Sequence, residues 1–253
     1  MNYKFSIITI NKNKAAGLEK TCLSVVTQTF KNYDWIIIDG GSTDNSIDII
    51  KNHSNYLSYW VSEPDSGVYN AMNKGIRKAT GDYLLFLNSG DHLLHPWTLQ
   101  ELYNEMSKKS NTDIFYSNSV TDTFEITIQP DNISFDYLIN NSINHQNCLF
   151  KKELFEHQLY DETYTMISDW YFMVIKMNNS KISFIHLNTI MAMVEKIGIS
   201  SDKYKRFEEK SNAFEKLGIK RKKIRKFKFL RKIKKIIVNI LPYGIYKLVF
   251  INK

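Results

Sequence analysis

The sequence predicts an α/β fold in which a mostly parallel sheet is flanked by helices. Short apolar runs alternate with helical patterns through the first 95 residues, which is the order of a parallel sheet with right-handed crossovers. Four of these runs end in a polar residue: Asn11, Asp39, Asp65 and Asp91. Because ligands of open α/β sheets bind beyond the carboxyl ends of the strands, we expect a ligand site at this edge.

The elements of this first part follow from hydrophobic periodicity. Apolar, β-rich runs predict strands at 4–10, 33–38, 57–61 and 83–87. Leu18, Cys22, Val25 and Val26 have the spacing of one helical face. Further helices are expected around 47–50 and over 68–78.

The second part, from residue 113 to 200, has a less regular pattern. Strands are expected at 113–117, 124–128, 147–150 and 182–187, and a helix over 168–177. The segment 138–143 fits either type. The length of 253 residues is sufficient for one large core, and 43% apolar with 24% charged residues is ordinary for a globular protein.

The C-terminal segment differs from the rest of the chain in charge. Residues 216–253 contain 14 of the 34 Lys and Arg residues and no acid, so the preceding residues are mildly acidic. Over 220–241, apolar and basic side chains fall on different halves of a helix, as in an in-plane membrane anchor. We expect residues 216–253 to form a basic amphipathic tail that binds an anionic membrane surface through 220–241. A helix packed on the body and a nucleic-acid contact are the alternatives.

Several features indicate the compartment. Cys22 and Cys148 lack metal-type spacing and indicate a reducing environment. The N-terminus lacks the features of a signal peptide, and no apolar run reaches 18 residues. We therefore expect a cytosolic protein without a membrane-spanning helix.

The turn after the second predicted strand, Asp39-Gly40-Gly41-Ser42-Thr43-Asp44, has the residues of a ligand loop. Its glycines let backbone approach a ligand, and the following helix offers free N–H donors. The turn is neither a dinucleotide fingerprint nor a phosphate-binding Walker loop. A tight turn with a helix cap explains the same residues.

The sequence resembles glycosyltransferase family 2 through several motifs in order. They are Phe5–Thr9, Ser24–Phe30, Ile36–Asp44, Ala71–Ile76, Ala79–Tyr83 and Phe86–Asp91. The run Ser62–Asn70 is similar to the branch of colanic-acid, capsule and O-antigen type transferases that build bacterial surface polysaccharides. The resemblance is dense over 3–95 and sparser at 144–200.

The resemblance implies a GT-A fold, a Rossmann-like nucleotide-diphospho-sugar transferase scaffold, over residues 1–215. Residues 1–95 would be the nucleotide-binding half and 96–215 the acceptor half. It also implies a nucleotide-diphosphate sugar donor, a divalent metal and inversion at the anomeric carbon. UDP is the preferred carrier, Mn²⁺ and Mg²⁺ are both compatible, and formation of a homo-oligomer is left open.

The resemblance also implies roles for individual residues on the donor side. It places there Thr9, Asn11, Asp39, Asp65, Asn73, Lys74 and Asn88. Asp39 is suited to accept the N–H of a uracil ring. Lys74 would face the phosphates, although a solvated helix lysine is an equal alternative.

Asp91 matches the last acid of the family's metal-binding motif. Asn88 and Gly90 stand where many relatives carry acids, and Met72 replaces a frequent arginine. Asp91 would therefore be the one firm carboxylate ligand, which suits Mg²⁺ because it binds through one or two carboxylates plus phosphates.

The second half would supply the catalytic base. Asp169 lies where the family's second acid is found, at the start of a helix, where the helix N-terminus favours its ionised form. A plain helix cap is the alternative. His145 and Gln146 match a pair that the branch places on the acceptor or diphosphate side, and Gly198-Ile199-Ser200 resembles a turn that closes over the donor.

These implications combine into one expected function. The protein would transfer one sugar from a nucleotide sugar to a lipid-linked saccharide in bacterial surface polysaccharide synthesis, at the cytoplasmic face of the inner membrane. A nucleotidyltransferase on a related scaffold and a non-catalytic nucleic-acid-binding protein are the alternatives. If the protein transfers a sugar, no nucleic acid partner is expected.

Overall fold

The computed structural model describes residues 3–179, 182–196 and 202–219. The chain divides into two compact units, one up to Lys203 and one from Tyr204. Helix α7 (Lys203–Lys216) belongs to the second unit except for its first residue. The expected domain boundary after residue 215 stays a prediction, and so does the fit of the tail to a membrane. Residues 220–241 of that tail, and the turn Gly198–Ser200, lie outside the described residues.

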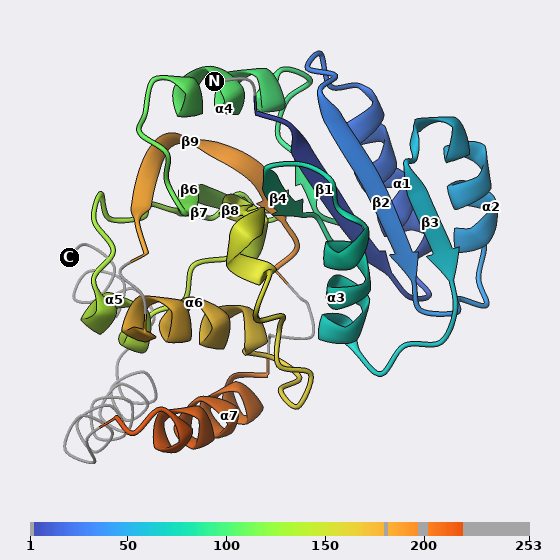
Figure 1. Ribbon diagram of the computed structural model, residues 1–253. Coiled ribbons are helices and arrows are strands. Elements are labelled where there is room, and N and C mark those ends of the chain that lie inside the picture. Colours follow the sequence, from blue (N-terminus) through green and yellow to red (C-terminus); the bar gives the residue numbers. More distant parts are fainter. Residues whose placement is uncertain (1–2, 180–181, 197–201, 220–253) are drawn as a thin grey trace. The chain divides into compact units, whose positions relative to one another are not determined.

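The first unit contains a mixed sheet with helices on both faces (Figure 1). Its described strands are β1 (Phe5–Asn11), β2 (Tyr33–Asp39), β3 (Tyr59–Ser62), β4 (Tyr83–Phe86), β5 (His92–Leu93), β6 (Ile114–Thr121), β7 (Ile126–Thr127), β8 (Cys148–Lys151) and β9 (Phe184–Val194). They lie in the order β3-β2-β1-β4-β8-β6-β9-β5, and β7 pairs with β6.

The predicted parallel half of the sheet is confirmed. Strands β3, β2, β1 and β4 all run parallel, and β1 pairs with β2 from Phe5↔Tyr33 to Asn11↔Asp39. Beyond β4 the direction changes, because β8 is antiparallel to both β4 and β6. The carboxyl ends of β1 and β2 therefore meet at one edge, which positions the site described below.

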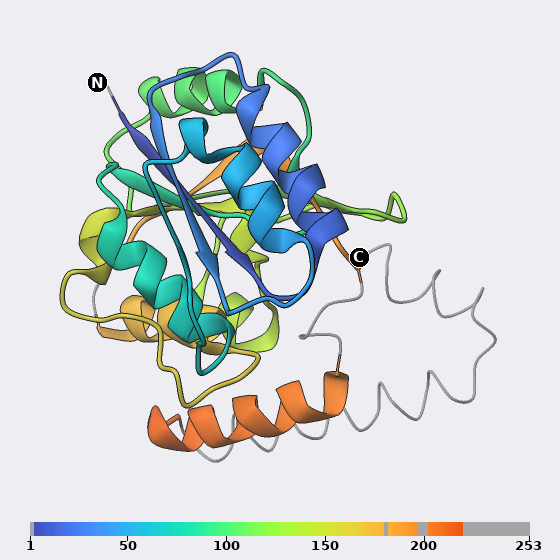
Figure 2. The same cartoon turned by 90° about the vertical axis from the view of Figure 1, so that its right-hand side faces the viewer.

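Helices lie on both faces of the sheet (Figures 1 and 2). They are α1 (Ala15–Val26), α2 (Ser46–Asn52), α3 (Val68–Lys78), α4 (Thr98–Ser107), α5 (Phe135–Asn140) and α6 (Ser168–Asn179), with 3₁₀ turns η1 (Ser54–Tyr56), η2 (His145–Asn147) and η3 (Lys152–Phe155). Successive strand residues point to opposite faces. Phe5 and Ile7 join the core cluster that contains Leu18 of α1, whereas Ile8 lies against Gly75 of α3.

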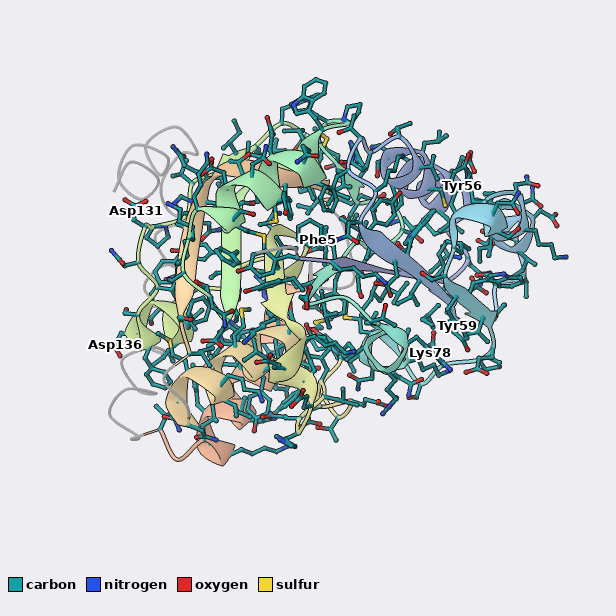
Figure 3. All side chains as sticks on the ribbon, turned by 45° about the horizontal axis from the view of Figure 1, so that its top comes forward. Phe5, Tyr56, Tyr59, Lys78, Asp131 and Asp136 are labelled. Atoms are coloured by element: carbon teal, nitrogen blue, oxygen red, sulfur yellow. The ribbon has the colours of Figure 1, made fainter. Side chains whose placement is uncertain are left out.

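Figure 3 shows labelled side chains both in the interior and near the outer strand β3. Phe5 lies in the interior, and Tyr56 of η1 is exposed at the periphery. The Lys78 Nζ lies 4.6 Å from the centre of the Tyr59 ring, a cation–π contact at the outer strand. The strand expected at 57–61 begins later, at Tyr59, and ends at Ser62, because the Leu57 backbone N–H still bonds to Ser54 O at the end of η1.

The strand expected at 124–128 is reduced to β7, the two-residue strand Ile126–Thr127. Phe124 has a φ of 59°, which belongs to a turn rather than to a strand. Phe124, Ile126 and Ile128 are 77%, 62% and 77% exposed, so their alternation does not mark a buried strand face. The hairpin of β6 and β7 projects from the sheet (Figure 2).

Two further expectations concern the cysteines and membrane helices. Cys22 and Cys148 are both buried as free thiols, and burial raises the pKa of Cys22 to about 12. Within the described ranges, no helix has the length and apolar character needed to cross a membrane.

Candidate active site

Asp39, the last residue of β2, is the centre of a hydrogen-bond network at the edge of the sheet. Its Oδ1 accepts hydrogen bonds from Asn11 Nδ2 at 2.7 Å and Ser42 Oγ at 2.6 Å. Its Oδ2 accepts from the Ser42 backbone N–H at 2.8 Å and Ser62 Oγ at 2.6 Å. A carboxylate has about four acceptor positions, so this fully buried group is saturated by its own neighbours.

The pKa of Asp39 reflects this network. Burial of the carboxyl raises its pKa, but the hydrogen bonds from Ser42, Ser62 and Asn11 outweigh burial and hold the pKa below its usual range. Asp39 is therefore a stable carboxylate at neutral pH.

Asn11 connects the ends of three neighbouring strands. Its Nδ2 donates to Asp39 after β2, and its Oδ1 accepts from Ser89 Oγ at 2.7 Å in the loop after β4. Thr9, two residues earlier, is fully buried and accepts a hydrogen bond from Trp35 Nε1 at 3.1 Å. Thr9 is thus joined to the core beneath Asn11 rather than directly to Asp39.

Asp91 lies in the loop after β4 and is 4% exposed. Its Oδ2 accepts hydrogen bonds from Gln146 Nε2 at 3.0 Å and from the Asn88 backbone N–H at 3.2 Å. Its Oδ1 accepts from the Glu195 backbone N–H at 3.1 Å. Burial, which the charge of Glu195 reinforces, raises the pKa of Asp91 despite these bonds. This carboxylate is therefore less well compensated than Asp39.

Asp169 lies in the first turn of α6 and meets two side chains from other elements. Its Oδ2 lies 2.8 Å from His145 Nδ1, and its Oδ1 accepts a hydrogen bond from Tyr69 Oη at 2.8 Å. Burial raises its pKa, but the hydrogen bond and charge of His145, with the Tyr69 hydroxyl, lower the pKa below the usual value. Asp169 is consequently held ionised and can accept a proton.

The turn η2 joins these two acids. Adjacent residues of η2, His145 and Gln146, contact Asp169 and Asp91 respectively. The Asn88 Nδ2 lies 3.2 Å from His145 Nε2, so the loop after β4 also contacts η2 through this pair. The structure therefore brings together five predicted site residues: Asn88, Asp91, His145, Gln146 and Asp169.

Three predicted donor-side residues have different surroundings. Asn73 bonds to the backbone of Tyr160 and to Glu162, so its amide fixes the loop that precedes α6. Lys74 forms an ion pair with Glu63 at 2.7 Å. Asp65 accepts from the Gly67 backbone N–H at 3.0 Å, and its other oxygen lies against Gly40. Of these three, only Asp65 is in contact with the turn after Asp39.

The surroundings of Asp91 fit a hard divalent cation. Among the residues that the structure describes, no three His, Cys, Asp or Glu side chains gather as a metal site. The Asn88 Oδ1 is, however, buried without a hydrogen-bond partner in the described part of the chain. An amide oxygen and one carboxylate are donors that Mg²⁺ accepts together with phosphate oxygens and water.

Sequence reasoning gave no role beside Asp91 or Asp169 to three residues: Tyr69, Lys14 and Glu195. Tyr69 lies in a quoted motif, but 100 residues separate it from Asp169, and no local pattern predicts their contact. Glu195 is 104 residues from Asp91, and its carboxylate forms an ion pair with Lys14 at the start of α1. These contacts depend on the tertiary fold alone.

Comparison with protein families gives one match over most of the chain. A sequence model described as glycosyl transferase family 2 matches residues 6–164. An uncharacterized glycosyltransferase of Mycobacterium tuberculosis is 40% identical over 105 residues, which are 41% of this chain and only 40% of that relative. A PGL/p-HBAD biosynthesis glycosyltransferase of Mycobacterium bovis is 28% identical over 205 residues, 77% of each chain.

Solved structures give the same architecture. S. aureus TarS 1-349 in complex with UDP-GlcNAc has a TM-score of 0.67 and 18% identity, over 83% of this chain and 66% of that chain. Glucosyl-3-phosphoglycerate synthase of Mycobacterium tuberculosis, in complex with Mn²⁺ and UDP, has a TM-score of 0.62 and 13% identity, over 87% and 81%. These likenesses confirm the GT-A fold. Together with the family match they favour glycosyl transfer over nucleotidyl transfer or nucleic-acid binding.

Proposed function

The chain belongs to glycosyl transferase family 2, and from this premise we propose that it transfers one sugar from a UDP-sugar to a lipid-linked saccharide, with inversion at the anomeric carbon. One observation carries the proposal. Asp169, a carboxylate held ionised, and Asp91, a carboxylate with an unpaired amide oxygen near it, contact adjacent residues of η2. The proposal assigns the base to Asp169 and the cation-binding group to Asp91.

In the proposed reaction Asp169 is the general base. The acceptor hydroxyl attacks the anomeric carbon from the face opposite the diphosphate, and the bond from that carbon to the diphosphate oxygen breaks. The hydroxyl proton passes to Asp169. Tyr69 and His145 orient the carboxylate from two sides, and the lowered pKa keeps it unprotonated before the reaction.

The leaving diphosphate requires charge neutralisation. A divalent cation, Mn²⁺ or Mg²⁺, would supply it as a Lewis acid when bound. Asp91 and the Asn88 Oδ1 are the groups of this chain that would hold the cation. Two observations support this assignment: the unpaired amide oxygen beside a carboxylate, and the Mn²⁺ in the structure of the related synthase.

UDP is the preferred carrier because of Asp39. A uracil N–H donates a hydrogen bond, and Asp39 is a permanent acceptor at the strand edge. All four of its acceptor positions are filled, so the base would replace the hydroxyl of Ser42 or Ser62. Such a replacement exchanges one hydrogen bond for another at little net cost.

The lipid-linked acceptor places the protein on the cytoplasmic face of a bacterial membrane. Two observations support this part of the proposal. Residues 220–235 hold 11 basic residues and no acid, and the exposed apolar side chains of Phe124, Ile126 and Ile128 lie on a projecting hairpin. Flotation of the full chain on anionic and on neutral lipid vesicles tests the placement.

The Asp169→Asn variant tests the function. A screen of UDP-, GDP- and dTDP-sugars by thermal shift with Mn²⁺ first identifies the donor. Transfer to a lipid-linked saccharide in vesicles should then fall by about 10²–10⁴-fold in the variant, with donor affinity unchanged, because only the proton acceptor is lost.

Asp48→Asn is the matched control, since Asp48 is an exposed acid in the first turn of α2 and contacts none of these groups. Near-normal transfer by Asp169→Asn with full donor binding would show that Asp169 is not the base. Failure of the wild type to transfer from any nucleotide sugar would refute the proposed activity itself.

A further inference from the structure

Gly90, the residue before Asp91, has a backbone that leaves no room for a side chain. Its φ is 104°, a left-handed conformation that favours glycine. A Cβ atom at this position would overlap the carboxylate of Glu195. The space that a side chain at position 90 would enter is therefore filled by the carboxylate of Glu195, the residue after β9.

Glu195 is also fixed to Asp91 through its backbone. Its N–H donates to Asp91 Oδ1 at 3.1 Å, so the residue that lays its carboxylate over Gly90 also orients the Asp91 carboxylate. The two acids come from segments 104 residues apart. Two carboxylates on one side of a loop repel each other unless a cation lies nearby.

Lys14 supplies such a cation in the present structure. Its Nζ forms an ion pair with Glu195 Oε2, and its side chain is 42% exposed against 28% for Glu195. Lys14 comes from the loop after β1, at the same edge as Asn11 and Asp39. It is thus a partly solvated cation near the place where the donor diphosphate is expected.

We propose that Glu195 is the second carboxylate for the divalent cation, in place of the acid that position 90 lacks, and that Lys14 pairs with it until cation and donor bind. This inference rests on the proposed function, since it concerns the cation of the sugar-nucleotide site. On binding, the cation replaces Lys14 at Glu195, and Lys14 pairs with the diphosphate. The site then holds Mg²⁺ or Mn²⁺ through two carboxylates plus phosphates, within the usual ligand number from protein.

Direct Mn²⁺ binding by the full chain tests the proposal, with free Mn²⁺ measured by electron paramagnetic resonance in the presence and absence of UDP. Glu195→Gln should weaken Mn²⁺ binding at least about tenfold, the lower end of what loss of even an outer partner costs. Lys14→Met should strengthen Mn²⁺ binding without UDP, because the competing cation is gone, and should weaken UDP binding. Glu105→Gln is the matched control, because Glu105 is ion-paired to Lys108 in α4 and should leave Mn²⁺ binding unchanged.

The outcomes separate the inference from the proposed function. Mn²⁺ binding that is equal in wild type, Glu195→Gln and Lys14→Met would mean that the ion pair is only structural, and the inference would be wrong. Absence of Mn²⁺ binding by the wild type with UDP present would overturn the proposed metal dependence together with the inference. Circular dichroism of each variant confirms that a loss of binding is not a loss of folding.

Discussion

Asp39 at the end of β2 and Asp91 in the loop after β4 are both buried at the same edge of the sheet, but their pKa values shift in opposite directions. Asp39 accepts four hydrogen bonds, and its pKa is lowered although burial opposes this. Asp91 accepts three, a second carboxylate lies nearby, and its pKa is raised by burial. The number and kind of donors, rather than burial alone, sets the state of each acid.

This difference separates an acid whose charge is fully compensated within the protein from one whose charge is not. Asp39 has no free acceptor position, so its charge is already stabilised by the protein. Asp91 retains acceptor capacity in a buried position, where an incomplete set of donors costs free energy. A bound cation would remove that cost. Although both acids are buried, we expect substitution of Asp91 to affect cation-dependent activity and substitution of Asp39 to affect stability.

The largest effect is expected for Asp91→Asn. The amide keeps the shape but loses the charge, so Mn²⁺-dependent transfer should fall by more than the roughly 100-fold that loss of an outer-shell partner costs. Steady-state transfer across a Mn²⁺ titration measures this loss, and added metal should not restore the rate.

Asp136→Asn is the control for this experiment, because Asp136 is an exposed acid in the first turn of α5 (Figure 3). Wild-type rates that persist in the presence of a chelator would contradict the assignment of Asp91 as a cation ligand.

Only part of the sheet could be predicted from the sequence. The parallel half was predictable because strands such as β1 and β4 are buried on both faces and read as continuous apolar runs. The strand at 124–128 was predicted too long, because its alternating apolar residues are exposed and alternation normally implies a buried face.

Likewise, only some of the site residues could be predicted from the sequence. Asp39 and Asp91 could be predicted because Asp39 ends its strand and Asp91 lies in the loop shortly after its strand. Asp169, His145 and Gln146 came from the family resemblance, and only the fold shows that η2 joins the two acids. The contacts of Tyr69 and Glu195 could not be predicted, since each spans about 100 residues without any local pattern.

A smaller effect, on stability, is expected for Asp39→Asn. The amide cannot accept from all of Asn11, Ser42 and Ser62, so at least one buried donor loses its partner. This change should lower the free energy of unfolding by about 1–3 kcal/mol at neutral pH. Urea unfolding followed by circular dichroism measures it.

The effect of Asp39→Asn should depend on pH. The folded-state pKa of Asp39 is lowered, so the stability it contributes is present above its unfolded pKa, about 3.9, and is lost as pH falls through the folded value. The difference in stability between wild type and variant should therefore shrink on acidification below about pH 4. A difference that stays constant between neutral pH and about pH 3 would mean that the carboxylate charge does not contribute.

The smallest effect is expected for Ser62→Ala, which removes one of the four hydrogen bonds to Asp39. Three donors remain on the carboxylate, and water can reach the partly buried position of Ser62, so the loss should be about 0.5–1.5 kcal/mol. Ser66→Ala is the control, because the exposed Ser66 hydroxyl makes only a long contact, 3.5 Å, with Glu162. If Ser62→Ala destabilised the protein as much as Asp39→Asn, the stability of this loop would depend on one hydrogen bond rather than on a saturated carboxylate. The number of hydrogen bonds to each carboxylate would then no longer explain the difference between Asp39 and Asp91.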